Sequence, residues 1–218
     1  SLPLLLILWL FVPAPKLDAE FYRAFAIALP LEIVTIILYI KALRVSPLSL
    51  TLPFLAITPV FLIFISYLLV GEKVSFRGGA GIFLIAAGSY TLNISEIKKG
   101  ILEPFRSIPR EKGSVFMIGV ALIYCFTASL GKIAIEHSSP LFFVITYYIA
   151  LTICFAPIAF WMGRKELGVF FRDKQFRKLV QPGVFFAVMA ATHMLAMNLT
   201  KVAYMISVKR LSLIIGIM

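Results

Sequence analysis

Ionisable residues inside long apolar runs are the places where this sequence could do chemistry. Glu32 lies near the middle of an apolar segment that runs from 21 to 43. A charged carboxylate in apolar surroundings is costly unless it is paired, hydrated or protonated. Glu32 could therefore bind a ligand or exchange a proton in a central cavity. It could equally be a structural group that is hydrogen-bonded to a neighbouring helix.

His193 is the second ionisable residue of this kind, in the apolar segment 181 to 203. Shifting the chain on itself by 161 residues places Glu32 on His193, and the same shift superimposes several further residues: Phe25-Ala26 on Phe186-Ala187, Ala42 on Ala203, Ser46 on Ser207, Leu50 on Leu211 and Leu52 on Leu213. An inverted repeat would bring both ionisable residues to one midplane cavity. There they could form a pair that exchanges protons near neutral pH; the alternative is an ordinary core histidine.

An adjacent basic pair, Lys209 and Arg210, begins the last apolar segment. Arginine can bind a carboxylate or phosphate through two parallel hydrogen bonds, and lysine acts as a point charge. The pair predicts an anionic or zwitterionic ligand, although such side chains can also extend from a helix end to a membrane surface. Further candidates for a polar lining are Lys132, with a local ion pair to Glu136 as the favoured alternative, and Tyr147 and Asn198.

Composition decides which class of protein must position these residues. The chain of 218 residues is 61% hydrophobic and only 14% charged, and its mean hydropathy is +1.00. A soluble domain is about half apolar and about a quarter charged, so a water-soluble globule is excluded. The net charge of +11 lies mostly in short tracts between apolar runs. This pattern favours loops that face anionic lipid, and no nucleic-acid partner is expected.

The apolar stretches have the length that a bilayer requires, about 20 residues each. Two partial segments, 1 to 12 and 205 to 218, flank six whole ones: 21 to 43, 46 to 70, 76 to 93, 114 to 135, 140 to 163 and 181 to 203. Both chain ends lie inside apolar runs, so we expect the first and last helices to be cut. Cys125 and Cys154 also lie inside apolar runs and are interpreted as small core residues. No disulfide, metal site or cofactor is expected.

Small residues and prolines predict local geometry within the segments. Gly81 and Gly88, seven residues apart, predict a close approach of two helices. Prolines that could kink helices and shape cavities are Pro30, Pro53, Pro59 and Pro157.

The stretch from Lys41 to Asn93 carries a recognisable order of features. An Ala-Leu pair ends one helix, a central proline and a Gly-Glu pair bound the next, and a glycine-rich helix follows: Ala42-Leu43, Pro59, Gly71-Glu72, and Gly78, Gly79, Gly81 and Gly88. In this order and spacing the chain resembles the EamA-type transporters of the drug/metabolite transporter superfamily. The resemblance implies an all-α polytopic membrane protein of two inverted five-helix repeats, ten helices when complete, with about eight represented here.

On that template the chain divides into a first repeat at 1–93, cut at its start, a basic linker at 94–113, and a second repeat at 114–218, cut at its end. The family arrangement implies that both basic loops, 94 to 113 and 164 to 180, lie outside the cell. The positive-inside rule implies the reverse, because 13 of the 21 bases fall on the side of these loops and 8 on the other. The membrane orientation therefore stays open, with the charges slightly favouring both basic loops on the cytoplasmic side.

Three classes of function follow, in order of preference. The first is a multi-pass permease of the cytoplasmic membrane that moves small metabolites by secondary active transport, with proton coupling as an option. The second is a membrane scaffold or receptor that moves nothing. The third is an intramembrane enzyme, which is disfavoured because the sequence has no HExxH or GxSxG motif and no paired aspartates. Substrate identity and oligomeric state do not follow from these residues.

Overall fold

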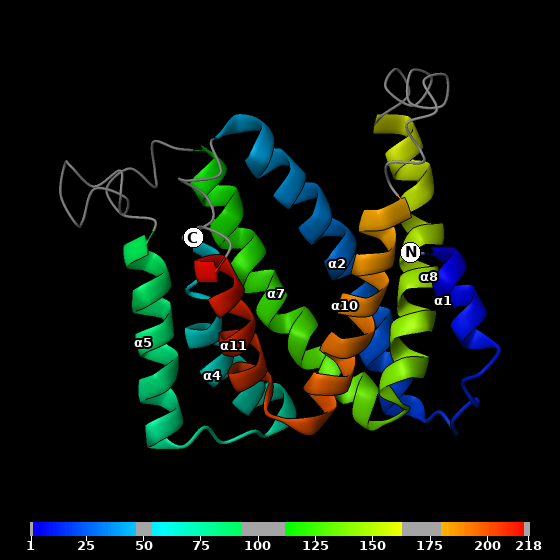
Figure 1. Ribbon diagram of the computed structural model, residues 1–218, viewed down its shortest axis with the longest axis horizontal. Coiled ribbons are helices and arrows are strands. Elements are labelled where there is room, and N and C mark those ends of the chain that lie inside the picture. The colour runs from blue at the N-terminus through cyan, green and yellow to red at the C-terminus, as the bar shows by residue number, and fades with distance from the viewer. Residues whose placement is uncertain (1, 47–53, 93–111, 163–179, 216–218) are drawn as a thin grey trace. The chain divides into compact units, whose positions relative to one another are not determined.

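The computed structural model describes residues 2–46, 54–92, 112–162 and 180–215, and these residues form eight helices (Figure 1). The helices are α1 (Leu2–Trp9), α2 (Ala19–Val45), α4 (Thr58–Val70), α5 (Phe76–Leu92), α7 (Lys112–Glu136), α8 (Pro140–Met162), α10 (Val180–Leu199) and α11 (Val202–Ile215). No strand occurs in the described part of the chain, so the predicted all-α class is confirmed.

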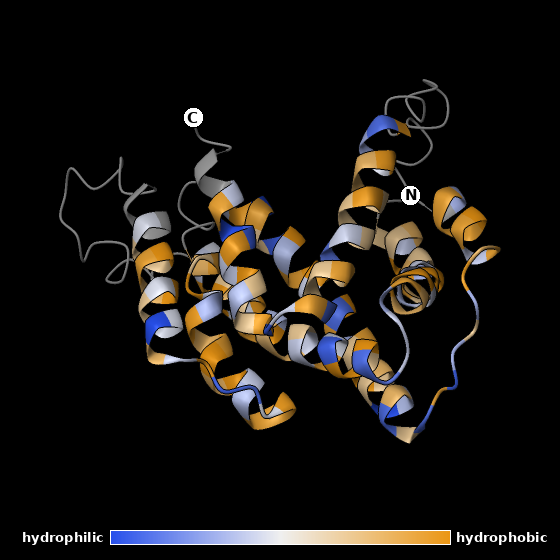
Figure 2. Ribbon diagram, turned by 60° about the horizontal axis from the view of Figure 1, so that its bottom comes forward, coloured by the Kyte–Doolittle hydropathy of each residue, from blue (hydrophilic) through white to orange (hydrophobic). Residues whose placement is uncertain are grey.

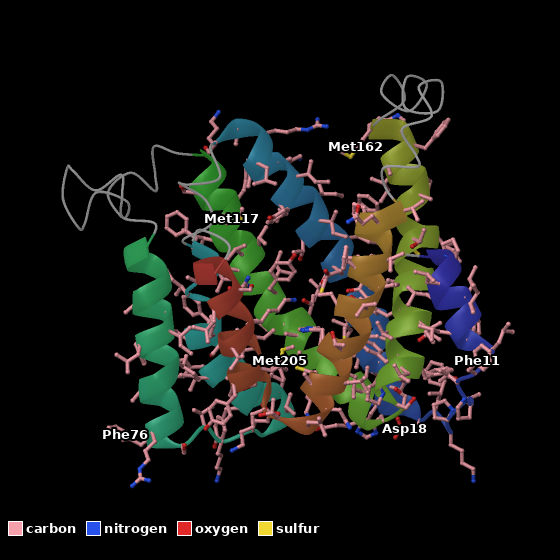
Figure 3. All side chains as sticks on the ribbon, in the orientation of Figure 1. Phe11, Asp18, Phe76, Met117, Met162 and Met205 are labelled. Atoms are coloured by element: carbon pink, nitrogen blue, oxygen red, sulfur yellow. The ribbon has the colours of Figure 1, made fainter. Side chains whose placement is uncertain are left out.

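Four of the described helices, α2, α7, α8 and α10, are long and apolar enough to cross a membrane. Hydrophobic residues predominate along the helices (Figure 2). Large apolar side chains remain exposed on them, with exposed fractions of 73% for Leu84 and 77% for Leu68. Phe76, at the start of α5, is 94% exposed (Figure 3). Such surfaces suit lipid and not water. The helices therefore belong to a multi-pass membrane protein.

The predicted span 76 to 93 agrees with α5 to within one residue, whereas the part of the predicted span 46 to 70 that the structure describes, from residue 54 onward, is interrupted before α4. Residues 56 and 57 form a turn, and α4 starts only at Thr58. Pro59 lies in the first turn of α4, where a missing N–H costs nothing, so it begins a helix and does not kink one. With 17 residues, α5 covers about 26 Å at roughly 1.5 Å per residue, slightly less than a bilayer core of about 30 Å. Pro30 and Pro157 do lie inside helices, and Pro53 is outside the described residues.

The chain divides into two compact units, and unit 1 comprises residues 1–29 and 133–199. It contains α1, α8 and α10, which pack against one another, and the start of α2. Its core forms around Leu5, Val144, Ile145 and Ala190. Cys154, predicted as a core residue, is exposed on α8, whereas Cys125 is buried.

Unit 2 comprises residues 30–132 and 200–218, and it contains α4, α5, α11 and the larger parts of α2 and α7. Helices α4, α5 and α11 pack against one another, and the contact of α2 with α7 encloses a second core, with Ala42, Met117 and Val120 fully buried. The close helix approach predicted at Gly81 and Gly88 is not found there within the described part of the chain, where a Cβ at either position would meet no atom within 4 Å. It occurs instead at Gly78, where a Cβ would lie 2.2 Å from the Tyr204 hydroxyl.

The two units combine elements from both halves of the sequence, so they do not follow the predicted boundaries 1–93, 94–113 and 114–218. Those boundaries describe duplication in the sequence and stay a prediction. The inverted repeat is not confirmed: a shift of 161 places Val202, the first residue of α11, on Lys41, which lies inside α2. The charge argument for orientation rests on loops that lie almost entirely outside the described residues.

Candidate functional site

Arg210 is the centre of a polar cluster inside unit 2. Its Nη2 atom donates a hydrogen bond to Thr58 Oγ1 at 3.5 Å, which joins α11 to the first residue of α4. Its Nε atom is buried and has no hydrogen-bond partner in the described part of the chain. Buried polar groups in native proteins are nearly always hydrogen-bonded, so an unpaired guanidinium nitrogen marks a place where a water molecule or a ligand can bind.

Three more side chains surround the guanidinium from two other helices. Tyr124 and Cys125 of α7 and Tyr39 of α2 interact electrostatically with Arg210. Cys125 Sγ is 3.5 Å from the Thr58 carbonyl oxygen, to which it donates, so α7 is joined to α4 at the same level as α11. Four helices thus supply groups to one place in unit 2.

Glu32 and Lys209 extend this cluster. The half-buried Glu32 carboxyl group lies within hydrogen-bonding reach of Thr127 and interacts with the charge of Lys209. Lys209 is exposed and interacts with both Glu32 and Arg210. The structure therefore brings together three of the residues singled out in the sequence. Their formal charges sum to +1, an arrangement that can bind a carboxylate or a phosphate, or a zwitterion whose cation contacts Glu32.

Lys132 is also in unit 2, but its setting is different. The side chain is only 5% exposed, and its Nζ atom donates to the carbonyl oxygen of Thr200 at 3.3 Å. Thr200 lies between the last residue of α10 and the first residue of α11. This contact is with the backbone at a helix junction, which gives Lys132 a role in placing α11.

The other three predicted residues lie in unit 1. His193 is half-buried on α10, and Asn198 is exposed near the end of the same helix. Tyr147 is buried, and its hydroxyl donates to the Ala28 carbonyl oxygen at 3.1 Å while its ring packs edge-on against Phe25. Tyr147 therefore connects α8 to α2. The pairing of His193 with Glu32 stays a prediction, because the two residues belong to different units.

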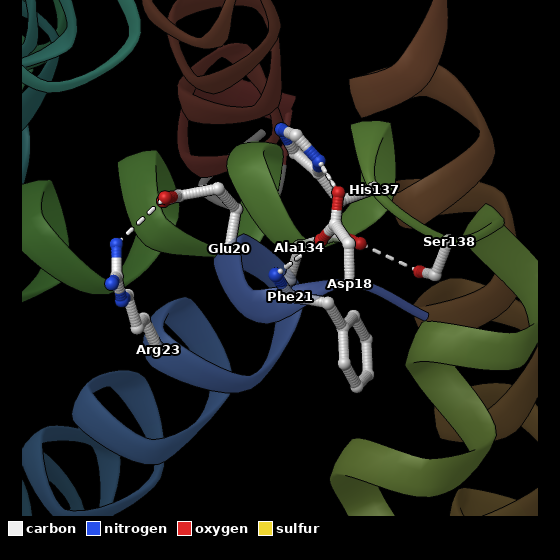
Figure 4. Close-up of polar contacts among 7 residues, drawn as sticks. All are labelled: Asp18, Glu20, Phe21, Arg23, Ala134, His137 and Ser138. Carbon is white, nitrogen blue, oxygen red and sulfur yellow. Dashed lines mark hydrogen bonds and ion pairs between the residues drawn. The ribbon is translucent and has the colours of Figure 1, made fainter. Parts of the chain in front are cut away.

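Sequence reasoning missed a polar contact at the start of α2 (Figure 4). Asp18 Oδ1 accepts a hydrogen bond from the Phe21 N–H at 3.0 Å, and Asp18 Oδ2 is 2.6 Å from His137 Nδ1. The N–H of Phe21 and then the hydrogen bond with His137 hold the pKa of Asp18 below its usual value. Aspartate directly before a helix is a recognised capping signal, whereas His137 is 119 positions away and only the fold could reveal it.

Comparison with known proteins supports a transporter family. The EamA-like transporter family matches residues 1–94, a stretch that contains α1, α2, α4 and α5 with the Gly71-Glu72 pair. No curated protein and no solved structure matches the chain. Among the described residues, no group of three or more His, Cys, Asp or Glu side chains could hold a metal ion. The resemblance found in the sequence is thereby confirmed over residues 1–94, the stretch of this multi-pass membrane protein that matches the EamA-like transporter family, part of the drug/metabolite transporter superfamily.

Proposed function

We propose that this chain is a secondary active transporter that moves small anionic or zwitterionic metabolites across the cytoplasmic membrane. The observation that carries the proposal is the Arg210 guanidinium, whose buried Nε has no partner among the described residues, beside Thr58, Lys209 and Glu32. Ionisable groups at membrane depth are costly and commonly mark substrate or ion pathways. The family match supports transport as the kind of activity.

The charges of the cluster favour the substrate class. Two cations and one carboxylate leave one positive charge without a counterpart in the trio, and a bound carboxylate or phosphate would neutralise it. Arg210 would bind the anion through its planar guanidinium, and Lys209 would add a second charge. A zwitterion could place its ammonium group against Glu32. A lipophilic cation would meet repulsion from both basic side chains.

Glu32 is the residue that we propose for proton coupling. Its interaction with Lys209 stabilises the carboxylate, and a substrate ammonium or a proton could replace that interaction during a cycle. His193, in unit 1, is a second candidate for this role. Tyr147, Asn198 and Lys132 are proposed as supporting residues, with Tyr147 and Lys132 acting through backbone contacts.

Reconstitution of the full protein in proteoliposomes tests the proposal. A panel of organic acids, phosphorylated metabolites, amino acids and cationic dyes would be offered with and without an imposed pH gradient. We expect flux of at least one anion or amino acid and none of the dyes. For Glu32→Gln, which mimics the protonated carboxyl group, we expect exchange of substrate for substrate to continue while stimulation by the pH gradient is lost. Absence of flux for the entire panel would reject transport and leave the scaffold or receptor alternative.

A further inference from the structure

The segment between α4 and α5 is attached to the first turn of α11. Gly71 ends α4 in the left-handed conformation, with φ of 78°. In the next residue, Glu72 Oε2 accepts a hydrogen bond at 2.8 Å from the N–H of Val202, the first residue of α11. The first N–H groups of a helix have no acceptor within the helix, and a carboxylate there also complements the helix dipole. Glu72 therefore caps α11 from 130 positions away.

Other contacts reinforce this attachment. Lys201 Nζ donates to the carbonyl oxygen of Lys73. The N–H of Ser75 donates to the Tyr204 hydroxyl at 3.1 Å, and the two hydroxyl oxygens are 3.2 Å apart. The beginning of α11 is thus bound to the segment 71–75 through both backbone and side chains.

The junction before α11 is held from its other side by Lys132. The buried ammonium group binds the carbonyl oxygen of Thr200, two residues before Val202. The Lys132 ammonium group thus faces a carbonyl just after the end of α10, and the Glu72 carboxylate faces the N–H at the start of α11. Both charges complement the backbone groups that they contact.

The position of α11 matters because the same helix carries the basic pair. Arg210 follows Val202 by eight residues, or about 12 Å along the axis. Helix α4 contacts α11 through Thr58 at its start and is followed directly by Glu72 at its end. Two contacts at opposite ends of α4 therefore determine how far α11 can slide or rotate beside it.

We infer that Glu72 and Lys132 are positioning residues that hold α11 so that Lys209 and Arg210 face the anion. This inference rests on the proposed function for the binding role of the pair. It also supplies a physical reason for the Gly-Glu order: glycine ends α4 in a conformation that other residues rarely adopt, and the next side chain caps the neighbouring helix.

The capping contact can be tested without transport. Amide hydrogen exchange of residues 202–205 would be measured in the full protein for wild type, Glu72→Ala, Glu72→Gln and the matched control Glu20→Ala. Glu20 is exposed and pairs with Arg23 on its own helix. Loss of a cap is expected to accelerate exchange about fivefold in Glu72→Ala. Glutamine, which retains an acceptor oxygen, should restore most of the protection, and the control should match wild type. Equal exchange in Glu72→Ala and wild type would overturn the inference.

The positioning role is tested by flux of whichever anion the wild type carries. For Glu72→Ala and Lys132→Met we expect KM to rise about fivefold or more while the maximal rate per folded protein stays within about twofold. Lys132→Arg should recover most of the affinity, and Lys41→Met, at an exposed position on α2, should not change it. Combining Glu72→Ala with Arg210→Met should raise KM no further than Arg210→Met alone.

The possible failures are distinguishable. Faster exchange in Glu72→Ala with unchanged KM would mean that Glu72 caps α11 but does not position the basic pair, and the positioning role would be rejected. Flux that is absent even in wild type would reject the proposed function and the positioning role together, while the exchange data would still decide whether Glu72 caps α11.

Discussion

Replacing Gly78 with alanine is expected to lower the free energy of unfolding when residue 204 is tyrosine and to raise it when residue 204 is alanine. Built on the backbone, the alanine Cβ would lie 2.2 Å from the Tyr204 hydroxyl oxygen and 2.6 Å from Cζ. The ring must therefore move away and lose its contacts with Ser75. Two such hydrogen bonds contribute about 2 kcal/mol together, whereas alanine in place of glycine gains about 1 kcal/mol in a helix. The net effect in wild type is a destabilisation of about 1 kcal/mol.

In a Tyr204→Ala background the obstacle is gone, so the same substitution should stabilise the protein by up to about 1 kcal/mol. The coupling between the two positions is then about 2 kcal/mol, within the range found for residues in contact. Gly79→Ala is the matched control, because a Cβ at position 79 meets no atom of the described residues within 4 Å. It should be neutral or stabilising in both backgrounds.

The assay is equilibrium unfolding in mixed micelles of six proteins, namely the parent, Gly78→Ala and Gly79→Ala in each of the two backgrounds, with helical circular dichroism as the signal. Equal changes for Gly78→Ala and Gly79→Ala in the wild-type background would refute the reasoning. So would the same sign for Gly78→Ala in both backgrounds, because the steric argument requires the sign to change when the ring is removed.

Three further outcomes are expected. Arg210→Met should weaken anion binding by about 10-fold to 100-fold, as expected for loss of hydrogen bonds to a charged group. Equilibrium binding of the labelled substrate measures this effect. Arg210→Lys should be intermediate, and Arg23→Met, at an exposed position, should bind like wild type. The stability that Asp18 contributes should be present above about pH 4 and lost as the pH falls through its lowered pKa. Asp18→Asn can still cap α2, but it should remove this pH dependence from the free energy of unfolding. Gly71→Ala should destabilise by about 1 to 2 kcal/mol in thermal unfolding, because φ of 78° strains residues with a side chain, and Gly79→Ala should not.

The side chains proposed to bind the substrate and the pair that makes stability depend on pH lie in different units of the molecule. Arg210 and Glu32 interact with groups on α4, α7 and α11 in unit 2, whereas Asp18 and His137 connect α2 to the end of α7 in unit 1. Loss of the latter contact should therefore alter the pH dependence of stability without altering which anions are carried. Measurement of both properties on the same variants separates binding from folding.

The sequence could predict the fold class and the candidate charges because both are local properties. Runs of about 20 apolar residues predict membrane helices, and an ionisable side chain within such a run is conspicuous because it is costly there. This reasoning selected Glu32, Lys209 and Arg210, which the structure places in one cluster. It did not predict the turn at residues 56 and 57 within the 46 to 70 segment, because hydropathy alone does not show where Pro59 begins a new helix.

The partners of these residues could not be predicted in the same way. Thr58 and Tyr124 are unremarkable in an apolar sequence, yet they surround Arg210 after α4 and α7 pack beside α11. The 161-residue shift places Val180, the first residue of α10, on Ala19, the first residue of α2, but it places the first residue of α11 inside α2. Short apolar identities are common among membrane helices and contain little information about which helices are neighbours.

By itself the amino-acid sequence determined that the chain enters a membrane, that it is helical, and that its first part resembles the EamA-like transporters. Only the tertiary structure decided that Glu72 caps a helix 130 positions away and that Lys132 binds the backbone before the same helix. The physical reason is that hydropathy and capping signals act over a few residues. A hydrogen bond between distant residues exists only after packing has brought their helices together.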